Sequence, residues 1–154
     1  MIVGHLAAGY LAARGLAAVG APAVFAGLLI GSVLPDIDML WFFFIDGQQT
    51  HHHDYITHRP VVWAIALALA AVIQRPFFVG LGMGGLLHLA LDSIVGKVAW
   101  AWPFSNVAKP LVEVPATQSH WVLSFLFHWT FAVEIALCVI ALVLFFQRRR
   151  SSSF

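Results

Sequence analysis

The stretch FFVGLGMGGLLHLALDSIV, residues 77–95, decides the class of this protein. The residues before His88 carry no charge, and the Gly80-xxx-Gly84 spacing permits a helix to pack closely against a neighbour. His88 and Asp92 are four residues apart, so a helix presents both on one face. The sequence therefore places an imidazole and a carboxylate at the end of an apolar helix.

The rest of the chain is also apolar. Of its 154 residues, 61% are hydrophobic and 10% are charged, and the mean hydropathy is +0.89. These values indicate a membrane protein. The net charge of +1 gives no basic surface that would bind nucleic acid. We expect one domain over residues 1–154, without an intramolecular disulfide because Cys138 is the single cysteine.

We predict an all-α fold, a polytopic membrane bundle of about five helical segments. Their expected bounds are residues 2–19, 23–34, 60–73, 77–95 and 121–146. The aromatic residues 41–44 are expected to continue the second segment at the membrane interface, and residues 96–120 to form a long connection. No basic region precedes the first segment, so we expect a retained helix rather than a signal peptide. Residues 151–154 are expected to be a frayed tail.

The arginines predict an orientation. Arg148, Arg149 and Arg150 follow the last segment, so the positive-inside rule places the C-terminus in the cytoplasm. Counting back through the segments puts Arg75 and Arg14 on that side as well. The opposite side then receives the following groups: His5, residues 36–59, the His88–Asp92 helix end, His120, and a belt of Trp41, Trp63, Trp100, Trp102 and Trp121.

Histidines and aspartates on this shared side form a candidate metal site. Burying such groups in an apolar chain is costly unless something pairs with them, and metal ions bind this mixture of ligands. Asp36 and Asp38 follow Pro35 in what we expect to be an extended segment, where residues two apart point the same way. A turn or cap is the structural alternative. Residues 51–53 are three adjacent histidines that cannot all reach one ion, so the useful pairing is between this run and His58.

Each remaining group also has a structural alternative. His88 and Asp92 can be a hydrogen-bonded pair at a helix end, and His5 alone can be an interfacial histidine. Glu134, deeper in the last segment, is expected to be protonated or paired and to lie away from the metal. A polar stripe runs along the last segment from the residue before it, and structural hydrogen bonds are one possible role for its members: His120, Ser124 and His128.

These motifs resemble those of a known family. In order, they are His5, GSVLPDID at residues 31–38, the histidine run ending in Thr57-His58, and GLLHLALD at residues 85–92. Over roughly residues 1–105, including Trp102-Pro103, the chain resembles the YdjM-like inner-membrane metal-dependent hydrolases.

The His-Arg-Gly-x-Thr-His motif of that family implies ligands at His53 and His58. In this chain Asp54 and Tyr55 replace the Arg-Gly pair, and a variant spacing would use His52 instead. The family is distantly similar to zinc phospholipase C and nuclease folds, which implies hydrolysis of phosphoesters.

The expected metal is a divalent ion, with zinc as the first candidate. The candidate ligands are His5, Asp36, Asp38, His52, His53, His58, His88 and Asp92. They exceed what one tetrahedral zinc requires, so two or three ions sharing carboxylates are expected. Asp36 and Asp38 are also the candidate catalytic residues, as ligand or as the base that activates water.

The expected function is hydrolysis of a phosphoester or related bond in a lipid-like substrate that arrives from the bilayer. Arg59 is a candidate contact for an anionic substrate. Two alternatives remain. A metal-binding accessory subunit of a larger membrane complex predicts a closed site, and an ion carrier predicts ionisable residues throughout the bilayer depth. The expected location is the inner membrane, with several spans and with membrane lipid or another membrane protein as partner.

Overall fold

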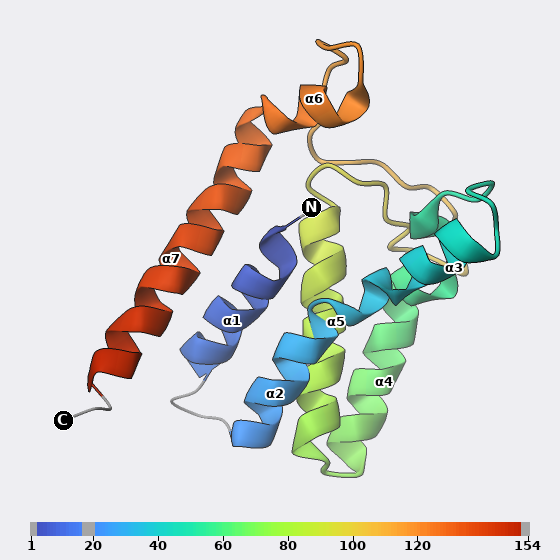
Figure 1. Cartoon of the computed structure of the whole chain (residues 1–154). Helices are drawn as coiled ribbons and strands as arrows, with labels where there is room; N and C mark the ends of the chain where they lie inside the picture. Colours follow the sequence, from blue (N-terminus) through green and yellow to red (C-terminus); the bar gives the residue numbers. More distant parts are fainter. Residues whose placement is uncertain (1–2, 17–20, 152–154) are drawn as a thin grey trace.

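The computed structural model describes residues 3–16 and 21–151 of the chain, and these residues form helices and connecting loops without strands (Figure 1). The elements are α1 (Gly4–Leu16), α2 (Pro22–Gly31), the 3₁₀ turn η1 (Leu34–Ile37), α3 (Asp38–Phe44), the 3₁₀ turns η2 (His52–Asp54) and η3 (Ile56–His58), α4 (Pro60–Val72), α5 (Pro76–Asp92), α6 (Trp121–Leu126) and α7 (Trp129–Ser151). The predicted all-α class is confirmed.

The predicted bounds hold to within about three residues for the second, third and fourth segments. Prolines at the first turns of α2, α4 and α5 explain these starts, because a proline needs no amide partner there. In the first segment, α1 covers the described part. Residues 2 and 17–19 of that segment, and residues 152–154 of the expected tail, lie outside the described residues.

Helices α2 and α5 are the central pair, and they run parallel to each other (Figure 1). Glycines on both helices allow the backbones to touch. A methyl group on Gly80 or Gly84 would overlap the carbonyl oxygens of Val24 and Leu28. The reciprocal contacts place Gly27 against Phe77 and Gly31 against Leu81. The predicted close packing through Gly80 and Gly84 is confirmed, and its partner is α2.

The parallel arrangement gathers helix ends at one end of the molecule. The C-terminal ends of α2 and α5 lie there together, and α1 and α4 run the other way, so they contribute their N-terminal ends (Figure 1). Trp63 fixes the start of α4. Its indole Nε1 donates to the carbonyl of Thr57 at 2.7 Å, and its ring packs against Gly85. With Leu89 and Val98 it forms the buried core beneath this end.

The last segment differs from its prediction, because it is two helices rather than one. Helix α6 ends at Leu126, and α7 begins at Trp129. His128 lies at this break and makes a 2.9 Å hydrogen bond to the hydroxyl of Thr130. Its Nδ1 also accepts from the Thr130 amide at 3.4 Å, which satisfies a donor at the start of α7. At its other end α7 continues through the arginines to Ser151.

Helix α7 lies along α1 at the side of the molecule (Figure 1). Among the described residues it is the one continuous helix that is long and apolar enough to cross a membrane, over Trp129–Arg150. A second candidate is the bent pair formed by α2 and residues 34–44, with an angle of 47°. Helices α4 and α5 have 13 and 17 residues, about 20 and 25 Å, against a hydrocarbon core of about 30 Å. The predicted five-span arrangement is therefore not confirmed.

The tryptophans of the predicted belt differ in exposure. Trp41, Trp100 and Trp121 are exposed on α3, in the connection after α5, and at the start of α6. Trp102 lies in the same connection and is half-buried. Trp63 was wrongly included in the belt, because it is a buried core residue.

Candidate metal centre

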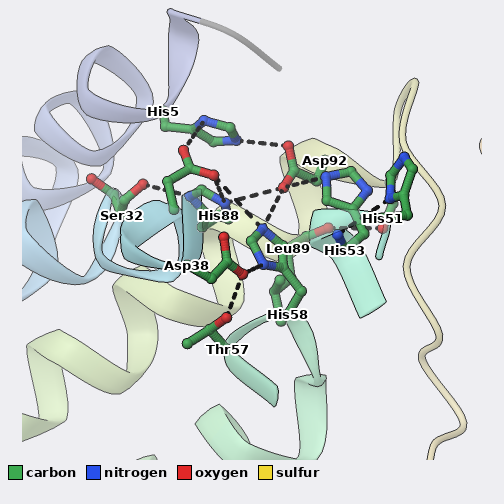
Figure 2. A network of polar contacts seen from close by, with 12 residues as sticks. His5, Ser32, Asp38, His51, His53, Thr57, His58, His88, Leu89 and Asp92 are labelled. Atoms are coloured by element: carbon green, nitrogen blue, oxygen red, sulfur yellow. Dashed lines mark hydrogen bonds and ion pairs between the residues drawn. The ribbon is translucent and has the colours of Figure 1, made fainter. Parts of the chain in front are cut away.

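The predicted ligands come together where the helix ends meet (Figure 2). His5 comes from the first turn of α1, and His88 and Asp92 from the last turns of α5. Asp36 comes from η1, just beyond α2, and His58 from η3, just before α4. Side chains that are far apart in the sequence thus share one cluster because four helices end there.

Asp92 is the centre of the cluster. Its Oδ1 lies 3.1 Å from Nε2 of His5. Its Oδ2 lies 3.1 Å from Nε2 of His88 and 3.4 Å from Nε2 of both His53 and His58. The side chain is 2% exposed. A buried carboxylate surrounded by four imidazoles is well placed to hold or bridge metal ions.

Asp36 lies on the side of the cluster opposite to Asp92. Its Oδ1 lies 3.5 Å from Nε2 of His88 and 3.7 Å from Nε2 of His58, and its Oδ2 lies 3.8 Å from Nδ1 of His5. The side chain of Asp36 is 39% exposed, whereas those of His5, His58, His88 and Asp92 are at most 4% exposed. The cluster is therefore open to solvent at Asp36.

The donor spacing fits a metal ion. One atom each from Asp36, His58, His88 and Asp92 lie within 4.8 Å of one another, and the four imidazole–carboxylate distances are 3.1, 3.4, 3.5 and 3.7 Å. Ligands about 2.0–2.2 Å from a tetrahedral ion are about 3.3–3.6 Å apart, whereas charge-assisted hydrogen bonds are about 2.7–2.9 Å long. Nε2 of His5, His58 and His88 is buried and makes no hydrogen bond. The residues present could therefore hold a metal ion.

Asp36 and Asp38 do not lie in an extended segment, as we had expected. They lie in η1 and at the start of α3, because Pro35 begins a helical turn instead of an extended strand. Residues two apart on a helix point in nearly opposite directions, about 200° apart. Asp36 therefore faces the cluster directly, while Asp38 approaches it from behind His58.

Asp38 orients His58. Its Oδ2 accepts a 2.6 Å hydrogen bond from Nδ1 of His58 and a 2.5 Å hydrogen bond from the hydroxyl of Thr57 (Figure 2). With Nδ1 bound in this way, Nε2 of His58 is directed at Asp36 and Asp92. Carboxylates commonly hold metal-binding histidines by this kind of contact. Thr57 and His58 therefore share the Asp38 carboxylate as acceptor.

Two partners of the cluster were not found from the sequence. The backbone carbonyl of Ser32 accepts a 2.9 Å hydrogen bond from Nδ1 of His88 and fixes its ring. Gly96 leaves room for His53, since a methyl group there would overlap the imidazole. A backbone carbonyl carries no sequence signal, whereas Gly96, four residues after Asp92, is a signal that the sequence does carry.

The histidine run divides as expected, with one member solvated. His51 is exposed, His52 is half-buried, and His53 is buried with its Nε2 toward Asp92. Burial first, and then the neighbouring His53 side chain, lower the pKa of His52 to about 4. His52 is therefore neutral at physiological pH, which is the form that binds metal.

His52, His53 and His58 form a second group whose donors lie within 4.8 Å of one another. His58 belongs to both groups, but its Nδ1 is bound to Asp38, so its Nε2 serves one ion. The two groups therefore cannot be two independent and complete sites.

Several predicted polar residues lie outside the cluster. His120 accepts from the Val122 amide at the start of α6, and Ser124 accepts from the Gln118 amide at 3.0 Å. Glu134 is buried in α7 and accepts hydrogen bonds from the amides of Val3 at 2.7 Å and Gly4 at 3.0 Å. The expectation that it is paired and away from the candidate metal site agrees with these contacts.

Arg59 is held by structural contacts. Its Nη2 donates to the Asp54 carbonyl at 2.7 Å and lies 3.6 Å from the Asp54 carboxylate. Its guanidinium lies over the ring of Trp102 at 5.8 Å. These contacts tie the histidine loop to the connection after α5, and they favour a structural role over the predicted substrate contact.

Comparison with known proteins places the chain in a family. No curated protein and no solved structure matches it. The family model described as YdjM inner membrane protein matches residues 1–152, which extends the resemblance beyond residue 105 to nearly the whole chain. The protein therefore belongs to the YdjM inner membrane protein family.

Proposed function

We propose that this protein is a membrane-embedded, metal-dependent hydrolase that acts on a phosphoester or related bond of a lipid-like substrate. The observation that carries the proposal is the spacing of Asp36, His58, His88 and Asp92. Their donor atoms lie as close together as the ligands of one ion would. Zinc is the first candidate, because it takes histidine and carboxylate ligands together. A bound divalent ion would act as a Lewis acid, lowering the pKa of a water molecule and stabilising a leaving oxygen.

The residues of the cluster have separate roles in this proposal. His58, His88 and Asp92 are buried, and they would hold the ion in place. Asp36, as the solvent-exposed member, borders the side from which water and substrate arrive, and it is the candidate base. Asp38 is a positioning residue, because its contact with the cluster passes through His58.

A second ion is also part of the proposal. Asp92 uses one oxygen toward His5 and the other toward His53, His58 and His88. A carboxylate whose two oxygens face different imidazoles could serve two ions, and a second ion would help to stabilise both the attacking and the leaving oxygen. His5, His53 and His52 are the residues available for the second position.

The two alternatives predict other arrangements. An accessory subunit predicts a metal enclosed by protein, but the exposed edge of Asp36 leaves one side of the cluster open. An ion carrier predicts ionisable groups along a path across the membrane. The main buried ionisable residue outside the cluster is Glu134, and it accepts hydrogen bonds from the backbone amides at the start of α1. Both observations support the hydrolase over its alternatives.

The test begins with metal analysis of the purified protein in lipid nanodiscs. Wild type should bind zinc and melt at a higher temperature with it, since saturation at about 100 times Kd contributes about 2.7 kcal/mol. The Asp92→Asn variant should lose both effects. Glu113→Gln is the matched control, because it makes the same carboxylate-to-amide change on an exposed residue.

The second part is a screen of phospholipids and synthetic phosphodiesters. We expect zinc-loaded wild type to cleave at least one class, and Asp92→Asn to be inactive. A protein that binds zinc through these residues and cleaves no member of the screen would favour the accessory subunit. Absence of metal binding would overturn the proposal.

A further inference from the structure

An apolar groove lies beside the cluster, between α3 and the loop that carries His58. Its volume is about 630 Å³, within the range of about 300–1,000 Å³ that is typical of small-molecule sites. Six apolar side chains line it, and each is more than half exposed: Ile37, Leu40, Trp41, Phe44, Ile45 and Ile56. Such a concentration of exposed apolar surface indicates a place where hydrocarbon or another apolar surface binds.

The charges around the groove exclude an anionic occupant. No cationic side chain lines it among the described residues. Its carboxylate, Asp38, is buried and already accepts hydrogen bonds from Thr57 and His58. A phosphate group placed in the groove would therefore lack a counter-charge. An uncharged hydrocarbon chain would pay no such desolvation cost.

The groove borders the candidate metal centre. Its first lining residue, Ile37, directly follows Asp36, which is the exposed member of the cluster. At its inner wall, Asp38 and Thr57 contact His58, so one imidazole ring separates the groove from the donors of the cluster. A molecule whose polar group reaches Asp36 could therefore lay an apolar chain along α3.

The dimensions favour a single hydrocarbon chain over a protein partner. Helix α3 has seven residues, about 10 Å of helix, which is a short track for a partner helix. The protein belongs to an inner-membrane family, so lipid chains are the most abundant apolar molecules in its surroundings. The exposed Trp41 on the same helix is of a residue type that accumulates at membrane interfaces.

We propose that this groove binds one hydrocarbon chain of a membrane lipid whose headgroup lies at the Asp36 side of the candidate metal centre. The inference that the groove is occupied rests on its exposed apolar lining and on the inner-membrane family of the chain. The assignment of that lipid as the substrate rests on the proposed hydrolase function.

The experiment uses the full chain in nanodiscs that contain a phospholipid with a photoreactive diazirine on one acyl chain. After irradiation, mass spectrometry maps the cross-linked residues. We expect cross-links to concentrate on residues 37–45 and 55–57, above the level on the exposed apolar residues of α7, such as Val139 and Leu142. An even spread over all exposed apolar surfaces would overturn the proposal, because it would show bulk lipid only.

Two variants provide the matched comparison. Leu40→Trp fills the groove, whereas Phe43→Trp enlarges an exposed residue of α3 that does not line it. Leu40→Trp should reduce groove cross-linking about tenfold, the change produced by a loss of about 1.4 kcal/mol, while Phe43→Trp should leave it unchanged. Equal cross-linking in both variants would overturn the proposal. Cross-links from the groove to a second copy of the chain, in place of cross-links to lipid, would also overturn it.

The same preparations separate this proposal from the hydrolase proposal. Zinc binding should be the same in Leu40→Trp and wild type, because Leu40 contributes no ligand. Cross-links confined to the groove in a protein without metal or hydrolysis would support the groove and refute the hydrolase. Hydrolysis that Leu40→Trp leaves at its wild-type rate would refute the assignment of the bound chain to the substrate.

Discussion

Asp38 acts on the cluster through an imidazole. Its Oδ2 receives both Nδ1 of His58 and the hydroxyl of Thr57, at 2.6 and 2.5 Å. These contacts fix the ring so that Nε2 is the atom offered to an ion. A carboxylate in this position also makes the imidazole a stronger ligand. Asp38 should therefore affect metal affinity without being a ligand itself.

Replacing Asp38 tests this role. We expect Asp38→Ala to weaken zinc binding about 10–100-fold, the usual cost of removing such a partner. Asp38→Asn should cost less, because its amide oxygen can still accept from Nδ1. Competition with a chromogenic chelator gives the affinities, with Glu113→Gln as the control. A loss in Asp38→Ala as large as that of Asp92→Asn would instead identify Asp38 as a ligand.

The chemistry of the site could be predicted from the sequence, but its exact membership could not. Imidazoles and carboxylates in an apolar chain indicated the cluster. The path of the loop decided that His53 is buried and His51 exposed, and that path depends on Gly96, which leaves room for the imidazole. The carbonyl of Ser32 could not be identified as a partner before the fold was known, since every residue has a carbonyl.

At the scale of elements, the glycine contact between α2 and α5 sets the geometry of the cluster. Asp36 follows α2, whereas His88 and Asp92 are on α5. The distance between these ligands therefore depends on how closely two helices approach through Gly80 and Gly84.

Gly84→Ala should disturb both stability and the metal site. The new methyl group would overlap the carbonyl of Leu28, and overpacking of this kind typically costs about 1–3 kcal/mol. Thermal unfolding and zinc affinity in nanodiscs are the measurements. Gly15→Ala is the control, because outside its own helix no atom of the described residues lies within 4 Å of its Cβ position. Retained stability and affinity in Gly84→Ala would show that the two helices can separate without moving the ligands.

Glu134 links α7 to the element that carries His5. It is fully buried and accepts from the amides of Val3 and Gly4, which would otherwise lack partners at the start of α1. We expect Glu134→Ala to lower the free energy of unfolding by about 1–3 kcal/mol. Glu134→Gln should recover part of this, since its carbonyl oxygen can accept one of these bonds. Equal stability of both variants and wild type in thermal unfolding would contradict this link.

The elements also show where sequence reasoning failed. The apolar pattern located α2, α4 and α5 because a proline marks the start of each helix. It failed at Pro35, where a proline in a helical turn was interpreted as the start of an extended segment. It failed again at Phe127. Apolar residues continue across the break there, so the sequence pattern does not mark the boundary between α6 and α7.

At the scale of the whole molecule, most of the arginines lie apart from the His/Asp cluster, whereas Arg59 lies beside it on the histidine loop. The turn between α4 and α5, which holds Arg75, lies at the end opposite to the His/Asp cluster, and so does the C-terminal end of α7 with its three arginines (Figure 1). Arg14, in the last turn of α1, is at that end as well. This arrangement agrees with the predicted grouping of Arg14, Arg75 and the C-terminal arginines, and the positive-inside rule predicts from it that the arginine end is cytoplasmic.

The orientation can be measured with single cysteines in a Cys138→Ser background. Gln49→Cys is exposed in the loop after α3, near the cluster, and Ser153→Cys follows the arginines. On intact cells, a membrane-impermeant maleimide should label Gln49→Cys, because we place the cluster outside the cytoplasm. Ser153→Cys should react only after the membrane is opened, since transferring three adjacent arginines across the bilayer is unfavourable. Labelling of Ser153→Cys from outside would invert the orientation. Labelling of both positions from the same side would show that α7 does not separate the cluster from the C-terminus.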